Sequence, residues 1–169
     1  MKIKYFIATL MAAAAASAAQ AAHPNTSLAV IPQPREVAET PQADVFTLGP
    51  DTRVKAVPGL ENEASLLKEY MSALPAATPS GEITLRADLA DKNPEAYTLE
   101  VTPSEIVING ASPAGLFYGI QTLRKAAFGA PAGQAAVIPS GKVSDAPRFA
   151  YRGAMFDICR HYFTPDEVK

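Results

Sequence analysis

The strongest constraint on the fold is a pair of alternating segments separated by a short turn. Apolar and polar residues alternate over 97–101, which is the pattern of a strand with one buried face. A second apolar run covers 105–109, Thr102-Pro103-Ser104 lies between the two, and Asn109-Gly110 is a strong turn signal. We therefore predict an antiparallel hairpin that packs one face against a core.

Two amphipathic helices are predicted on either side of this hairpin. Apolar residues recur at three- and four-residue steps over 61–74. The second helix opens at Ser112-Pro113, because Ser caps free backbone N–H groups and Pro at the first helical position loses no hydrogen bond. Short strands are predicted at 45–48, 82–89 and 137–138, with a linker over 141–147.

The fold class expected for residues 31–145 is α+β. Strands and helices do not alternate there as strict βαβ units. We therefore expect an antiparallel sheet with two helices on one face.

The pattern changes in residues 146–169. A dense, mostly apolar run from Arg152 to Ile158 leads into Asp157, Arg160 and His161, and Thr164-Pro165-Asp166-Glu167 is a helix start with a capping box. This predicts the first strand and first helix of a (β/α)₈ barrel. Such a barrel needs about 250 residues, so we expect a truncated catalytic domain.

The amino terminus is typical of an export signal. Lys2 and Lys4 precede an apolar stretch over 5–16, and Ala19-Gln20-Ala21 fits a cleavage site. We predict a signal peptide over 1–21, a flexible leader over 22–30, and a periplasmic or secreted protein with no membrane span after cleavage. The single cysteine, Cys159, excludes an internal disulfide and is expected to be a small buried hydrophobe rather than a nucleophile.

Composition argues against several classes of partner. The formal charge is −2 and no basic run occurs, so nucleic acid is not expected. No cluster has metal-ligand spacing and no Gly-rich phosphate loop is present, so we expect neither a metal nor a cofactor.

Four stretches together resemble the amino-terminal region of family 20 glycoside hydrolases, the β-N-acetylhexosaminidases. They occur in the order and at the spacing of that family: Ile31-Pro-Gln-Pro34; Glu95 to Val101 with Ile106 to Gly110; Ala114 to Leu123; and Pro147 to Gly153 with Asp157 to Phe163.

The resemblance implies a small α+β domain before a catalytic barrel. It also implies release of terminal β-linked N-acetylglucosamine or N-acetylgalactosamine by substrate-assisted, retaining catalysis. The catalytic Asp-Glu pair of the family belongs to a later barrel strand, so no catalytic residue is expected in this chain. Asp166-Glu167 is interpreted as helix capping, because acids in a first turn favour the dipole.

One substrate-binding residue carries over from the resemblance, Arg160, which in the family binds hydroxyls of the terminal sugar. Its five donors in a fixed fork suit neighbouring hydroxyls, and the alternative is an ion pair with Asp157. Supporting roles at the barrel mouth are expected for Asp157 and His161, and a structural role at a strand end for Arg152.

Two other functions stay open. One is another sugar hydrolase with a similar accessory domain, such as an α-glucuronidase, and the other is a short exported binding module. The residues encoded downstream separate them, since an Asp-Glu pair ending a barrel strand favours family 20. The partners expected under the leading hypothesis are N-acetylhexosamine-terminated glycans and the remainder of the catalytic domain.

Overall fold

The computed structural model describes residues 27–40, 44–128, 133–157 and 162–168. Within these ranges, six strands form the main sheet in the order β1-β8-β5-β6-β4-β3, and two more form a small sheet, β2-β7. The strands of the main sheet are β1 (Glu36–Glu39), β3 (Arg53–Ala56), β4 (Glu82–Arg86), β5 (Tyr97–Val101), β6 (Glu105–Gly110) and β8 (Gly141–Asp145). The small sheet pairs β2 (Val45–Leu48) with β7 (Ala136–Pro139) in antiparallel register.

The predicted hairpin is confirmed as β5 and β6, which pair with Leu99 opposite Ile108. Both of these side chains are fully buried, whereas Thr98 and Glu100 point to the other face. That other face carries ion pairs between neighbouring strands, such as Lys55 Nζ with Glu82 at 2.5 Å. One face of the sheet therefore packs on the core and the other meets solvent.

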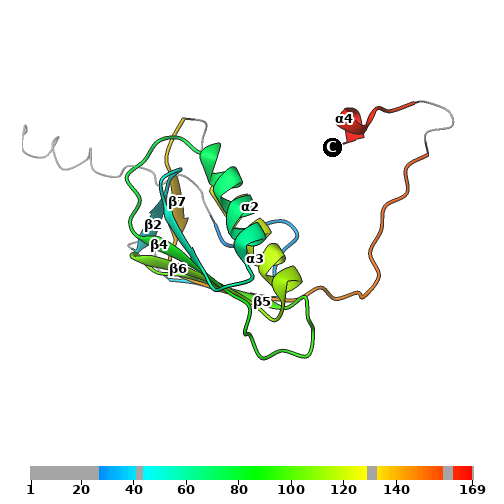
Figure 1. Ribbon diagram of the computed structural model, residues 1–169, viewed down its shortest axis with the longest axis horizontal. Coiled ribbons are helices and arrows are strands. Elements are labelled where there is room, and N and C mark those ends of the chain that lie inside the picture. The colour runs from blue at the N-terminus through cyan, green and yellow to red at the C-terminus, as the bar shows by residue number, and fades with distance from the viewer. Residues whose placement is uncertain (1–26, 41–43, 129–132, 158–161, 169) are drawn as a thin grey trace, which may run out of the picture.

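The two helices, α2 (Glu61–Ser72) and α3 (Pro113–Phe128), pack against each other and cover one face of the sheet, as Figure 1 shows. The helix start at Ser112 is confirmed, since Ser112 Oγ accepts from the backbone N–H of Ala114 at 3.1 Å. The core between helices and sheet holds aliphatic side chains from every layer, including Leu67, Ile83, Leu99, Ile106, Leu116 and Ile120.

The predicted antiparallel sheet is confirmed in part, because the strands on one side of it run parallel. Strand β3 runs parallel to β4, and β4 runs parallel to β6. Strand β3, helix α2 and β4 form a βαβ unit. Parallel neighbours need a crossover connection, and α2 is that connection between β3 and β4. Strand β3 was missed because only Val54 among its residues is both apolar and partly buried.

The linker predicted over 141–147 is also corrected. Residues Gly141–Asp145 form β8, a central strand that pairs with β5 on one side and β1 on the other. Its sequence resembles a loop because Val143 is its only large apolar residue, but that side chain is fully buried. Pairing on both edges stabilises a strand that local composition does not predict.

The leader predicted over 22–30 lies partly outside the described residues. Within them, Leu28 is fully buried, and its backbone N–H donates to Glu39 Oε1 at 2.6 Å. Residues 27–30 therefore pack as part of the α+β domain. The signal peptide predicted over 1–21 lies wholly outside the described ranges.

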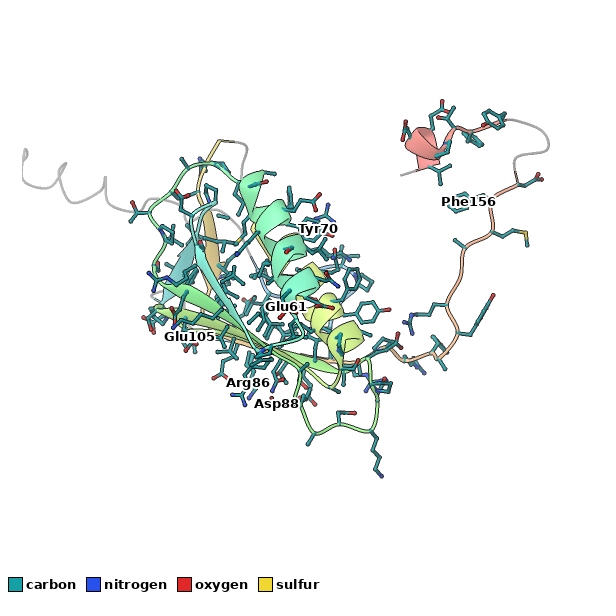
Figure 2. All side chains as sticks on the ribbon, viewed as in Figure 1. Glu61, Tyr70, Arg86, Asp88, Glu105 and Phe156 are labelled. Atoms are coloured by element: carbon teal, nitrogen blue, oxygen red, sulfur yellow. The ribbon has the colours of Figure 1, made fainter. Side chains whose placement is uncertain are left out.

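After β8 the chain leaves the sheet and the helices (Figure 1). Residues 151–157 are exposed and form no strand, in contrast to the predicted first barrel strand. A barrel strand satisfies its backbone groups through neighbours on both sides, and the described part of the chain supplies none there. Phe156 projects from this segment at a distance from the sheet (Figure 2).

The short helix α4 (Pro165–Val168) begins as predicted. Glu167 Oε2 accepts from the Thr164 backbone N–H at 2.8 Å, and the Glu167 N–H donates to Thr164 Oγ1 at 3.4 Å. This reciprocal pair is a capping box.

Candidate functional site

The polar contacts that tie the carboxyl-terminal segment to the α+β domain begin at the end of β8. Asp145 accepts a hydrogen bond from the Arg35 backbone N–H at 3.2 Å and one from the Tyr97 hydroxyl at 3.3 Å. Two residues later, the Pro147 carbonyl accepts from Asn93 Nδ2 at 3.3 Å and from Arg35 Nη2 at 3.4 Å. The chain is thus held on several sides as it leaves the sheet.

Further along this segment, three side chains bond to one another: Arg152, Glu95 and Tyr118. We call them the junction clamp, because they lie where the carboxyl-terminal segment joins the α+β domain. Arg152 Nη2 donates to Glu95 Oε1 at 2.7 Å, and Nη1 donates to Glu95 Oε2 at 3.2 Å. Tyr118 closes the triangle, accepting from Arg152 Nη2 at 3.0 Å and donating to Glu95 Oε1 at 3.1 Å. Bidentate pairing of guanidinium with carboxylate fixes orientation as well as distance.

Three separate elements supply the clamp. Glu95 lies in the turn before β5, where its backbone N–H donates to Asn93 Oδ1 at 2.9 Å. Tyr118 lies on α3, and Gly115, one turn earlier, lets the helix approach this turn so closely that a Cβ would overlap the Ala96 carbonyl oxygen. Arg152 reaches both from the segment after β8, and its Nη1 also donates to the backbone carbonyl of Phe149, three residues earlier, at 2.5 Å.

The clamp shifts the proton equilibria of its members. The Arg152 hydrogen bonds hold the pKa of Glu95 below its ordinary value, with a smaller contribution from Tyr118 and against a cost of desolvation. The same hydrogen bonds raise the pKa of Arg152 above its ordinary value. Glu95 and Arg152 are 27% and 39% exposed, so solvent screens part of their attraction. The pair stays charged through the neutral range.

A buried hydroxyl pair lies next to the clamp. The hydroxyl oxygens of Tyr97 and Thr122 are 2.6 Å apart, joining β5 to α3. Burial raises the pKa of Tyr97 above its ordinary value, and the nearby carboxylate of Asp145 adds to that rise. Tyr97 is therefore a fixed neutral donor rather than a base near pH 7.

A pocket of about 450 Å³ opens between α3 and the junction. Its lining includes Tyr97, Tyr118, Thr122, Lys125 and Arg152. Lys125 Nζ donates to the Ile31 carbonyl at 2.9 Å and Arg152 binds Glu95, while Arg35 and Arg148 also line the pocket. Such an arrangement holds chain segments together and offers no activated nucleophile.

The predicted site residues fall in different places. Arg160, His161 and Cys159 lie outside the described residues. Asp157 is described and exposed. The structural role expected for Arg152 fits its ion pair with Glu95, although no strand forms around it.

Capping explains Glu167, one of the two acidic residues at the carboxyl terminus. The Thr164 backbone and hydroxyl donate to Glu167, and these hydrogen bonds lower the pKa of Glu167.

No group of three or more His, Cys, Asp and Glu side chains in the described ranges is placed to hold a metal ion. None of the helices described combines the length and apolar character needed to cross a bilayer.

Sequence reasoning missed Glu95 and Tyr118 as partners of Arg152. The Glu95 carboxyl group and the Arg152 guanidinium belong to residues 57 positions apart, and no local periodicity links them. The available signal was indirect, since Glu95, Tyr118 and Arg152 all lie in the stretches that carry the family resemblance.

Together, the two-helix layer, the mixed sheet and the junction clamp define an α+β domain followed by an exposed carboxyl-terminal segment. Residues 27–146 match the family described as Glycosyl hydrolase family 20, domain 2. The chain therefore belongs to glycosyl hydrolase family 20.

Relatives agree with this assignment. A beta-N-acetylhexosaminidase from Cellulomonas fimi is 40% identical over 75 residues, which cover 44% of this chain and 15% of that protein. A beta-hexosaminidase from Vibrio furnissii is 28% identical over 147 residues, covering 85% of this chain and 23% of that protein.

Solved structures share the fold. The beta-N-acetylhexosaminidase of Streptomyces coelicolor matches with a TM-score of 0.65 at 28% identity, covering 85% of this chain and 31% of that one. The N-acetyl-beta-hexosaminidase of Streptomyces plicatus in complex with Thio-NAglucal matches with a TM-score of 0.67 at 28% identity, covering 83% and 31%. The chain spans less than a third of the length of each of these relatives.

Proposed function

We propose that this chain is the amino-terminal part of an exo-β-N-acetylhexosaminidase that releases terminal β-linked N-acetylglucosamine or N-acetylgalactosamine from glycans. The observation that carries the proposal is the family match over residues 27–146. The relatives named beta-hexosaminidases, found both by sequence and by structure, support it.

The reaction proposed is substrate-assisted hydrolysis with retention of configuration. The acetamido oxygen of the substrate attacks the anomeric carbon while a Glu protonates the leaving oxygen. A neighbouring Asp orients the acetamido group as it becomes an oxazolinium, and water then completes the hydrolysis. We assign neither carboxylate to this chain, because Glu167, in its acidic pair, caps α4. The 169-residue chain alone is expected to be inactive.

The contribution of this chain to the site is Arg160, on the grounds of its place in the Asp157-Ile-Cys-Arg160-His161 segment. A guanidinium donates in a fixed fork to two neighbouring hydroxyls, which suits the terminal sugar. Asp157 and His161 are proposed to orient the mouth of the barrel. The segment 146–169 is proposed as the start of that (β/α)₈ barrel, whose active sites form at the carboxyl ends of the strands.

The proposal includes export from the cytoplasm. The pattern over residues 1–21 is that of a cleaved signal peptide, and we propose a periplasmic or secreted enzyme that meets its glycans outside the cytoplasm. No cofactor enters the proposed reaction.

The test is a set of chromogenic glycosides offered to the full-length enzyme and to the 169-residue chain. We expect the full-length enzyme to hydrolyse 4-nitrophenyl β-N-acetylglucosaminide or β-N-acetylgalactosaminide, and to leave the β-glucoside, which lacks the acetamido group, intact. Proton NMR of the first-formed sugar is expected to show the β-anomer. Preference for an α-glucuronide would favour the other hydrolase, and no hydrolysis of any glycoside would overturn the proposal.

A point variant tests the sugar-binding residue. Arg160→Ala is expected to lower kcat/KM about 100-fold, because each hydrogen bond to a charged group contributes about 1.5–3 kcal/mol. Arg148→Ala, which removes an exposed Arg from the same segment, is the matched control and is expected to retain activity. Unchanged kcat/KM in Arg160→Ala would remove Arg160 from the site.

A further inference from the structure

The pocket between α3 and the carboxyl-terminal junction has no part in the proposed reaction, although its size and lining are those of a ligand site. Its volume of about 450 Å³ lies within the range of about 300–1,000 Å³ that is typical of small-molecule sites. The segment before β1, helix α3 and the chain that follows β8 all contribute to its walls. Apolar side chains, among them Val30, Pro32 and Pro147, form part of this lining, so the pocket is suited to an organic molecule with an apolar body.

Positive charge gathers around this pocket. One acid lines it, Asp145, against four cationic side chains: Arg35, Lys125, Arg148 and Arg152. The chain as a whole, by contrast, has a formal charge of −2. A concave surface lined by charges of one sign concentrates ions of the other sign, and the charge of this pocket therefore favours an anion.

Two of these cations are held by neutral acceptors. Lys125 Nζ donates to the Ile31 carbonyl at 2.9 Å, and Arg35 Nη2 donates to the Pro147 carbonyl at 3.4 Å. A backbone carbonyl satisfies one donor, but it does not cancel the positive charge. Because Lys carries three N–H donors and Arg carries five, each side chain retains donors for a bound anion.

The acid of the pocket does not neutralise the cations. Asp145 accepts from the Arg35 backbone N–H at 3.2 Å and from the Tyr97 hydroxyl at 3.3 Å, which are both neutral donors. Arg148 forms no ion pair with any acid in the described ranges, and its guanidinium carbon lies 5.6 Å from the centre of the Phe149 ring. Positive charge at Arg35, Lys125 and Arg148 is thus available to a ligand.

We propose that this pocket binds a small carboxylate that carries an apolar ring. The carboxylate accepts charge-assisted hydrogen bonds from the ammonium and guanidinium groups, which are about twice as strong as neutral ones. The ring lies against the apolar part of the lining. The ligand is held and not converted, because the pocket offers no activated nucleophile. Binding uses no part of the proposed hexosaminidase reaction, so this inference stands apart from the proposed function.

Binding is measured on the 169-residue chain with 4-fluorobenzoate, whose ¹⁹F resonance broadens on exchange with a bound state. We expect a Kd of about 1 mM, which is within reach of a ligand this small. The matched control ligand is 4-fluorobenzamide, which has the same shape without the charge and is expected to bind at least about tenfold more weakly. Equal binding of the amide, or no binding of either compound, would overturn the proposal.

Competition separates the ring from the charge. Unlabelled benzoate is expected to displace 4-fluorobenzoate at concentrations at least about tenfold lower than acetate or inorganic phosphate, because only benzoate also buries a ring. Displacement by phosphate as readily as by benzoate would show a general anion site and would contradict the ligand class proposed.

Two variants place the ligand in the pocket. Lys125→Met keeps most of the side-chain length and removes the ammonium group, and it is expected to weaken binding about tenfold. Arg148→Glu replaces a cation of the lining with an acid and is expected to weaken binding at least as much. The control is Lys68→Met, which removes the same charge from an exposed position on α2 outside the lining. Amide spectra establish that the variants are folded, and unchanged affinity in both pocket variants would refute the assignment.

The same titration on the full-length enzyme shows whether the pocket stays open in the whole protein. We expect a Kd within about twofold of that of the 169-residue chain, a difference that is small beside the tenfold effects expected above. Loss of binding would show that the rest of the enzyme fills the pocket, and it would overturn the proposal. An enzyme that binds 4-fluorobenzoate but cleaves no N-acetylhexosaminide would contradict the proposed function and leave the carboxylate site in place.

Discussion

At the scale of single residues, the most informative group is the Glu95 carboxylate. Its partners are a guanidinium and a phenol, and it is only partly exposed. An ordinary Glu titrates near 4.3, and the Arg152 hydrogen bonds lower the pKa of Glu95 below its ordinary value. Because the folded-state pKa is depressed, the stabilisation is complete above the ordinary value and is lost as pH falls through the lowered one.

This predicts a titration that depends on Arg152. Carboxyl ¹³C NMR of the wild type is expected to show Glu95 titrating below the ordinary range, and Arg152→Gln is expected to move the pKa upward. Lys142→Gln is the matched control, since Lys142 pairs with Glu100 on the open face of the sheet, and it should leave Glu95 unchanged. The same Glu95 titration in wild type and Arg152→Gln would show that the pair does not form in solution.

At the scale of elements, helix α3 organises both the core and the junction. It contacts β5, β6 and β7, and it carries Tyr118 to the clamp. The close approach depends on two glycines one turn apart. A Cβ at Gly115 would overlap the Ala96 carbonyl oxygen, and one at Gly119 would press on Ile108 Cγ2.

Gly115→Ala is therefore expected to destabilise the domain, despite the better helix propensity of Ala. Overpacking against rigid backbone costs about 1–3 kcal/mol, whereas Ala in place of Gly in a helix contributes only about 1 kcal/mol. Urea unfolding followed by circular dichroism measures the net loss. Ala114→Ser adds one atom at an exposed position of the same helix and should stay within about 0.5 kcal/mol of the wild type. Gly115→Ala with undiminished stability would show that α3 lies further from the turn before β5.

At the scale of the whole molecule, the chain has a packed domain and an exposed carboxyl-terminal segment (Figure 1). Large apolar side chains of that segment face solvent, with Phe156 63% and Tyr162 68% exposed. Clustered exposed apolar residues indicate a surface that packs against something else. Within the proposed function, this exposed surface packs against the remainder of the barrel.

Deletion of 153–169 tests this division, because it removes the exposed segment and leaves the clamp and every described strand in place. A hydrophobic dye such as ANS is expected to bind the 169-residue chain and to fluoresce much less with the deletion variant. The unfolding midpoint of the domain is expected to stay the same. Met155→Ser with Phe156→Ser should reduce the dye signal without shortening the chain. A deletion that lowers the unfolding midpoint would show that the segment belongs to the packed domain.

The local sequence by itself determined the hairpin of β5 and β6, both helices and the caps at Ser112 and Thr164, because side-chain periodicity and capping act over a few residues. The tertiary structure alone decided that Arg53–Ala56 and Gly141–Asp145 are strands, since each owes its place to neighbours far away in the chain. The same holds for the clamp, where the pairing of β5 with β8 places the turn that holds Glu95 beside the segment that holds Arg152. Strand pairing and ion pairing are contacts across space, and a pattern read along one segment carries no information about which distant segment will meet it.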